Sequence, residues 1–224
     1  MSFSFASVLL HSLSASIMAY GYNSLKTLPI DSLISTQYGG HFQFLTIQGL
    51  AIAWMTAIFG LASDIFPSVS VLKSLKRALF MIALPVEVVI SSIYWPLLLV
   101  ATQLILQPDN SAPSSSPDVQ PKFMRIPLSV DLALHAVPAL SLLADFLFFE
   151  KKYSQKQATY GAPLVASLFT LWYSWWVERC GSINDVYPYP FLTNNTFEGR
   201  ILIYLGAGIL AWVSFYLINR LHSQ

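Results

Sequence analysis

Three ionisable residues, Asp131, His135 and Asp145, lie in an apolar stretch from Leu128 to Phe149 that is long enough to cross a bilayer. On a helix with about 100° between successive residues, the three side chains fall on one face, within about 80° of each other. Charged groups in hydrocarbon cost a few kcal/mol each, so we expect this face to point into a helix bundle or a wet cavity. A histidine one helical turn from an aspartate is also the pairing in which an imidazole acts as a general base.

A histidine base needs a nucleophile, and Thr46 in the second apolar segment is a candidate. Counted from segment starts at His41 and Pro127, Thr46 lies about 8 Å and His135 about 12 Å deep, on the same side of the membrane. At similar depth, His135 can take the proton of the Thr46 hydroxyl while Asp131 orients the imidazole. The structural alternative is that Thr46 hydrogen-bonds the carbonyl four residues before it, as threonines in membrane helices usually do.

Other polar residues of the apolar segments extend this candidate network. Gln43, about one turn before Thr46, is a candidate for the hydrogen-bond donor that an oxyanion requires. Glu87 in the third segment and Asp145 near the end of the fourth are expected in the opposite half of the membrane. For both, a structural hydrogen bond or a partner on another helix is the expected role.

Composition places the chain in a membrane. Of 224 residues, 55% are hydrophobic and only 10% are charged, whereas soluble domains carry roughly 25% charged residues. The net charge of +1 gives no reason to expect nucleic acid as a partner. A single cysteine and four scattered histidines predict no metal site, and no cofactor is expected.

Six segments are long and apolar enough to span a bilayer, at about 3–23, 41–63, 79–106, 127–149, 159–177 and 201–219. The expected fold is an all-α polytopic membrane helix bundle with six transmembrane helices, in a single domain over residues 1–224. The connection 107–126 is rich in serine and proline and is expected to be irregular. The distribution of basic residues predicts that both termini are cytosolic. The expected location is the endoplasmic reticulum or another endomembrane, with the plasma membrane as the alternative.

Four short stretches match a known family pattern in order along the chain. They are Gly39 to Thr46, Leu84 to Glu87 with Tyr94 and Trp95, Asp131 to Pro138, and Tyr187 to Leu192. In these stretches the sequence resembles the six-span membrane proteins named for androgen-induced gene 1 and for the androgen-dependent tissue-factor-pathway-inhibitor-regulating protein. The resemblance covers nearly the whole chain.

Members of that family act as threonine hydrolases that cleave fatty acid esters of hydroxy fatty acids, using a threonine of the second span and a histidine of the fourth. The resemblance therefore implies that Thr46 is the nucleophile and His135 the base, and that the substrate is a lipid ester taken from the bilayer. It assigns no role to Asp131. The Ser/Pro loop is longer than the family's usual connection, which leaves the substrate preference open.

Two other functions are compatible with the same residues. The first is a non-enzymatic membrane protein for lipid binding, transport or regulation. In such a protein, Asp131, His135, Asp145 and Glu87 could form a proton or ion path. A lipid acyltransferase would use His135 as a base but would form no acyl-threonine. The sequence indicates no protein partner.

Overall fold

The computed structural model describes residues 4–108 and 123–222, and over these ranges it is helical, with one isolated β-bridge between Pro108 and Phe123. The long helices are α1 (Phe5–Leu25), α3 (Leu45–Ile65), α4 (Ser70–Val100), α5 (Leu128–His135), α6 (Val137–Phe148), α7 (Ala162–Asn184) and α9 (Phe197–Leu221). Short elements connect them: α2 (Asp31–Ile34), α8 (Pro190–Thr193), the 3₁₀ turns η1 (Gly40–Gln43) and η2 (Thr102–Leu104), and the π-helical turn η3 (Gln157–Gly161). Most of the Ser/Pro loop predicted at 107–126 lies outside the described residues.

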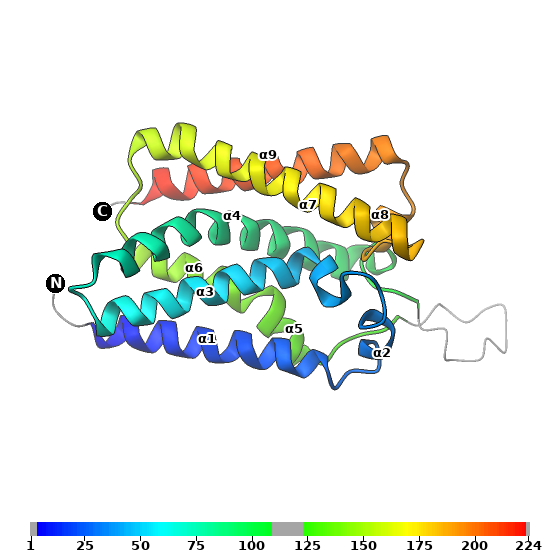
Figure 1. Ribbon diagram of the computed structural model, residues 1–224, viewed down its shortest axis with the longest axis horizontal. Coiled ribbons are helices and arrows are strands. Elements are labelled where there is room, and N and C mark those ends of the chain that lie inside the picture. Colours follow the sequence, from blue (N-terminus) through cyan, green and yellow to red (C-terminus); the bar gives the residue numbers. More distant parts are fainter. Residues whose placement is uncertain (1–3, 109–122, 223–224) are drawn as a thin grey trace.

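The long helices form one bundle with α4 in the middle (Figure 1). Helix α3 packs on one side of α4, and α7 and α9 pack on the other. Helix α1 packs on α3, and α5 and α6 lie against both α1 and α4. The ends of the chain lie together at one end of the bundle, and the short helices α2 and α8 lie at the opposite end (Figure 1). The main hydrophobic core includes three fully buried phenylalanines, Phe80, Phe146 and Phe215.

Within the described residues, three helices are long and apolar enough to cross a membrane: α3, α4 and α9. The α5–α6 pair adds a fourth if it is counted as one bent span. Helices α1 and α7 have 21 and 23 residues, which is long enough, but they carry more polar side chains. The all-helical membrane fold is therefore confirmed, whereas the count of six spans and the cytosolic termini stay predictions.

Several serine hydroxyls in α1 are satisfied within the helix itself. Ser12 and Ser14 donate to the carbonyls of Val8 and Leu10 at 2.7 and 2.6 Å. A hydroxyl bonded to the carbonyl of the preceding turn adds little polarity to the helix surface, so a serine-rich helix can pack in apolar surroundings.

Helix α4 begins at Ser70, well before the predicted start of the third span at 79. The extra turns carry Lys76 and Arg77, which form ion pairs with Glu150 at 2.8 Å each. These pairs join α4 to the connection after α6. The basic stretch therefore continues the helix, because its charges are neutralised by acidic groups far along the chain.

Small residues let α3 approach its neighbours closely. A Cβ atom on Gly60 would lie 2.6 Å from Nε2 of His11 in α1, and one on Gly49 would lie 2.6 Å from Cδ1 of Ile90 in α4. A larger residue at either position would force the facing side chains to move. The row of small residues on α3 therefore serves helix packing at these two positions.

Candidate active site

A tight turn leads the chain to Thr46. Gly39 and Gly40 have φ angles of 84° and 48°, a left-handed conformation that glycine adopts without strain. The turn η1 follows, and α3 starts at Leu45, whereas the sequence predicts a span that starts at His41. Thr46 therefore lies in the first turn of α3, at the end of the bundle away from the chain termini (Figure 1).

The Thr46 hydroxyl lies in a different setting from that of a threonine in the middle of a membrane helix. Such a threonine would bond the carbonyl four residues earlier. Here that residue is Phe42, which precedes α3, and its carbonyl accepts the side chains of Gln48 and Trp176 at 2.9 Å each. The Thr46 side chain, which is buried, interacts instead with the phenol of Tyr189.

His135 is the last residue of α5, and its main chain is held by α4. Pro138 lacks an amide hydrogen, so the helix is interrupted at Ala136, and α5 and α6 meet at a bend of 41°. The His135 carbonyl accepts the Ser91 hydroxyl at 2.6 Å and the Trp95 indole at 3.1 Å. Two donors from α4 therefore satisfy a carbonyl at the break, in surroundings where a bare carbonyl is costly.

The imidazole of His135 is oriented by two side chains. Its Nδ1 lies 2.8 Å from Oδ1 of Asp131, one turn earlier in α5. A carboxylate only accepts hydrogen bonds, so Nδ1 donates and Nε2 keeps the free lone pair. Tyr94 stacks on the ring with centroids 3.6 Å and planes 4° apart, and its hydroxyl hydrogen-bonds Asp131. This arrangement gives the imidazole the tautomer and fixed plane that a general base requires.

Thr46 and His135 line one pocket of about 300 Å³, which we call the Thr46–His135 pocket. Its walls come from the connection between α1 and α3, from α3, α4 and α5, and from the segment before α8. Most of the lining is apolar, and the volume is within the range of small-molecule sites. Such a pocket suits an apolar molecule that carries one polar linkage.

A second histidine–aspartate pair borders the same pocket. Nε2 of His41 lies 2.6 Å from Oδ1 of Asp31, and His41 lines the pocket. These side chains are 15% and 25% exposed, whereas those of His135 and Asp131 are each 9% exposed. The pair therefore lies nearer the surface than Asp131 and His135. Sequence reasoning missed it because Asp31 lies outside the predicted spans and no helical spacing connects it to His41.

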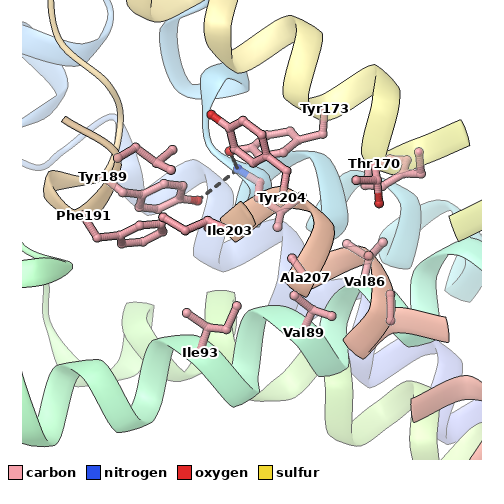
Figure 2. Close-up of a pocket in the computed structure, with 15 residues that line it drawn as sticks. Val86, Val89, Ile93, Thr170, Tyr173, Tyr189, Phe191, Ile203, Tyr204 and Ala207 are labelled. Carbon is pink, nitrogen blue, oxygen red and sulfur yellow. Dashed lines mark hydrogen bonds between the residues drawn. The ribbon is translucent and has the colours of Figure 1, made fainter. Parts of the chain in front are cut away.

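Two tyrosines bring their hydroxyls to the first residue of α3 (Figure 2). The Leu45 amide donates to Tyr173 at 3.1 Å and to Tyr189 at 3.0 Å. Tyr189 lines the Thr46–His135 pocket and also an apolar pocket of about 80 Å³ between α4, α7 and α9. Burial raises the pKa of the Tyr189 phenol, so the group is a neutral donor at ordinary pH. In the sequence, Tyr189 stands out only as part of the match from Tyr187 to Leu192.

Two predicted members of the polar network lie outside the pocket. Gln43 is fully buried, its amide nitrogen donates to the side-chain oxygen of Gln37 at 2.7 Å, and it does not line the Thr46–His135 pocket. Glu87 is fully buried against Gly49, and neither carboxylate oxygen has a hydrogen-bond partner among the described residues. No hydrogen bond to Glu87 is therefore seen among the described residues, and its contact with another helix is the packing against Gly49.

Asp145 belongs to a separate ion-pair cluster at the end of the bundle that holds the termini. It pairs with Lys76 of α4 at 2.9 Å and with Nε2 of His11 of α1 at 3.1 Å. Nδ1 of the same histidine lies 2.8 Å from Asp64 at the end of α3. Asp145 therefore joins three helices and does not contribute to the Thr46–His135 pocket.

Comparison with known proteins agrees with the resemblance seen in the four sequence stretches. The family model for FAR-17a/AIG1-like proteins matches residues 6–223. The UPF0641 membrane protein PJ4664.05 of Schizosaccharomyces pombe is 29% identical over 219 residues, which cover 97% of this chain and 91% of the relative. The UPF0641 membrane protein YHR140W of Saccharomyces cerevisiae is 26% identical over 196 residues, which cover 81% of this chain and 77% of the relative. No solved structure matches the chain. The chain therefore belongs to the FAR-17a/AIG1-like family.

Proposed function

We propose that this protein is an intramembrane lipid hydrolase that cleaves fatty acid esters of hydroxy fatty acids, with Thr46 as nucleophile and His135 as base. One observation carries the proposal: Thr46 and an imidazole bonded to Asp131 line the same apolar pocket. Membership of the family supports the same pair, because the sequence resemblance implies these two residues. The substrate enters from the lipid phase, to which such an ester partitions.

The reaction proceeds in two halves. In the first, Thr46 Oγ1 attacks the ester carbonyl carbon while Nε2 of His135 takes the hydroxyl proton. The bond to the hydroxy fatty acid then breaks, and the departing oxygen takes that proton from His135. In the second half, His135 removes a proton from water, which attacks the acyl-threonine, and the proton returns to Thr46 as the fatty acid leaves. The Asp131 carboxylate, bonded to Nδ1, stabilises the imidazolium.

An ion or proton path is the main alternative, and Glu87 bears on it. On α4, Glu87 lies about 16 Å along the axis from Lys76 and about 10 Å from Tyr94, at 1.5 Å per residue. Its carboxylate has no hydrogen-bond partner among the described residues, so no polar relay connects the Asp145 cluster to His135 through it. This gap favours the hydrolase.

We also propose that α1, α3, α4, the α5–α6 pair, α7 and α9 make the six spans of this chain, with both termini in the cytosol of an endomembrane. The length of each helix and the common location of the two ends support this topology (Figure 1). Protease protection of tags on the two termini in sealed microsomes tests it.

Labelling with a fluorophosphonate probe, combined with hydrolysis of a branched fatty acid ester, tests the activity. The samples are membranes holding the wild type, Thr46→Ala, Thr46→Ser, His135→Ala and the control Thr56→Ala. Thr56 is also buried in α3, but its hydroxyl donates to the Ile52 carbonyl at 2.7 Å. We expect labelling and hydrolysis in the wild type and Thr56→Ala, loss of both in Thr46→Ala and His135→Ala, and partial retention in Thr46→Ser. Equal hydrolysis by Thr46→Ala and the wild type would refute the proposal.

A further inference from the structure

The start of α3 holds a pair of phenol groups whose roles differ. Both Tyr173 and Tyr189 accept a hydrogen bond from the Leu45 amide, and Figure 2 shows the two rings reaching this nitrogen from different segments. Tyr173 comes from α7, whereas Tyr189 comes from the segment before α8. One acceptor is enough to satisfy the amide, so the second phenol is not needed for that purpose.

The two phenols have different neighbours, although their hydroxyls also contact each other. The Tyr173 hydroxyl donates to the Gln43 carbonyl at 3.3 Å, and of the two pockets Tyr173 lines the apolar one between α4, α7 and α9. The Tyr189 hydroxyl interacts with Thr46, and Tyr189 lines the pocket that holds Thr46 and His135. Of the two phenols, Tyr189 is therefore the one placed to donate to a group that sits against the Thr46 hydroxyl.

The Tyr189 ring is held in place by aromatic neighbours. It stacks on Phe191 with centroids 5.3 Å and planes 8° apart, and it meets Phe44 edge to face at 5.5 Å and 88°. Pro188 and Pro190 restrict the backbone on both sides. The hydroxyl position is therefore preorganised, which is the property that makes an oxyanion donor effective.

The surroundings also strengthen the phenol as a donor. Its oxygen accepts the Leu45 amide, and an accepted hydrogen bond polarises the O–H group. The amide belongs to the first turn of α3, a helix of 21 residues whose N-terminal end carries partial positive charge. Negative charge that develops on an oxygen beside Tyr189 is stabilised by both effects.

We propose that Tyr189 is the oxyanion donor of the hydrolase, a catalytic role that rests on the function proposed above. When Thr46 Oγ1 bonds to the carbonyl carbon, the carbonyl π pair moves onto its oxygen, and the Tyr189 hydroxyl donates to that oxygen. The phenol keeps its proton throughout. When the pair returns to re-form the carbonyl, the bond to the hydroxy fatty acid breaks, and the leaving oxygen takes its proton from His135.

The test compares Tyr189→Phe with Tyr173→Phe in full-length protein in lipid nanodiscs. Each variant keeps its aromatic ring and loses one of the two hydroxyls that accept from the Leu45 amide. If the hydroxyls serve only to hold this amide, the two substitutions should lower kcat by the same factor. We expect kcat for a branched fatty acid ester to fall about 10²- to 10³-fold in Tyr189→Phe with little change in KM. In Tyr173→Phe, kcat should stay within a few-fold of the wild type. Equal kcat values in the two variants would overturn the proposal.

A second measurement covers the case in which Tyr189→Phe does not fold. Replacement of Tyr189 by 3,5-difluorotyrosine keeps the shape of the residue and lowers the pH at which the phenol loses its proton. We expect kcat of the difluorotyrosine protein to decline at a lower alkaline pH than kcat of the wild type. Identical pH profiles of the two proteins would overturn the donor role. If the wild type shows no Thr46-dependent hydrolysis at all, the proposed function itself fails, and this result is distinct from a failure of Tyr189.

Discussion

The contact between Asp131 and His135 predicts a specific defect in Asp131→Asn. Asparagine keeps the shape of the side chain but removes its charge, and its amide can donate to Nδ1 of His135, which lies 2.8 Å from the carboxylate. Such a bond would move the imidazole proton to Nε2, where the ring can no longer act as a base. The variant therefore loses both the orientation and the stabilisation of the imidazolium.

The size of the defect follows from the geometry. With charge centres about 4 Å apart and an effective dielectric constant of about 20, the carboxylate stabilises the imidazolium by about 4 kcal/mol. This energy corresponds to about 10³-fold in rate. Asp131 does not itself line the pocket, so we expect kcat to fall by about this factor while KM stays nearly constant.

The assay is steady-state hydrolysis of a branched fatty acid ester, with Asp31→Asn as the matched control. The control breaks the second histidine–aspartate pair, between Asp31 and His41, at the same pocket. We expect it to retain activity within a few-fold of the wild type. If Asp131→Asn is as active as the wild type, or if Asp31→Asn alone loses activity, the assignment of His135 as the base is wrong.

Three further substitutions test the packing of the bundle. Lys76→Met removes the cation that the buried Asp145 shares with the half-buried Glu150. This leaves the two carboxylates with His11 and Arg77 as partners, so we expect the free energy of unfolding to fall by about 3 kcal/mol. Glu87→Met removes a buried carboxyl that has no hydrogen-bond partner among the described residues and keeps a similar volume, so we expect a gain of about 1–3 kcal/mol. Gly60→Ala places a Cβ atom 2.6 Å from the His11 ring and should cost about 1–3 kcal/mol, whereas the control Gly206→Ala meets no atom within 4 Å and should be tolerated.

The single cysteine offers a direct measurement of these stabilities. Cys180 is fully buried, so a thiol-reactive dye labels it only when the bundle opens. Thermal labelling curves of the variants in detergent then give their unfolding midpoints. Each packing argument has its own contradicting result. For Lys76→Met it is a midpoint equal to that of the wild type, and for Glu87→Met it is a lower midpoint. For the glycines it is equal midpoints in Gly60→Ala and Gly206→Ala.

Hydropathy and periodicity predicted the helical character of the chain and several element positions. The observed α1, α3 and α9 lie within a few residues of the predicted spans, because a long apolar run has few alternatives to a helix in lipid. The burial of Asp131, His135 and Asp145 also follows from their shared helix face. Helix α4 begins at Ser70, before the predicted start at 79. Its added turns carry Lys76 and Arg77, whose charges are neutralised by Glu150, and the hydropathy of the segment does not reveal a partner about 75 residues away.

Some features of the site can be predicted from the sequence and others cannot. Thr46, His135 and Asp131 can be singled out from the sequence, because each is a polar group in an apolar segment and two of them are one helical turn apart. The bend at Ala136 was missed although Pro138 is visible, because proline can also be accommodated without a break, as Pro85 and Pro96 are in α4.

The sequence by itself determined that the protein is a helical membrane protein, that one helix face carries acid–base groups, and that the chain resembles a family of threonine hydrolases. These are properties of local composition, spacing and short motifs. Only the tertiary structure decided that Tyr189 contacts Thr46, that Gln43 bonds Gln37 and does not line the Thr46–His135 pocket, and that Asp145 joins α1 and α4 through His11 and Lys76. Contacts such as that between Leu45 and Tyr189 join segments 144 residues apart, and they form because the packed helices bring buried donors and acceptors together where no water can satisfy them.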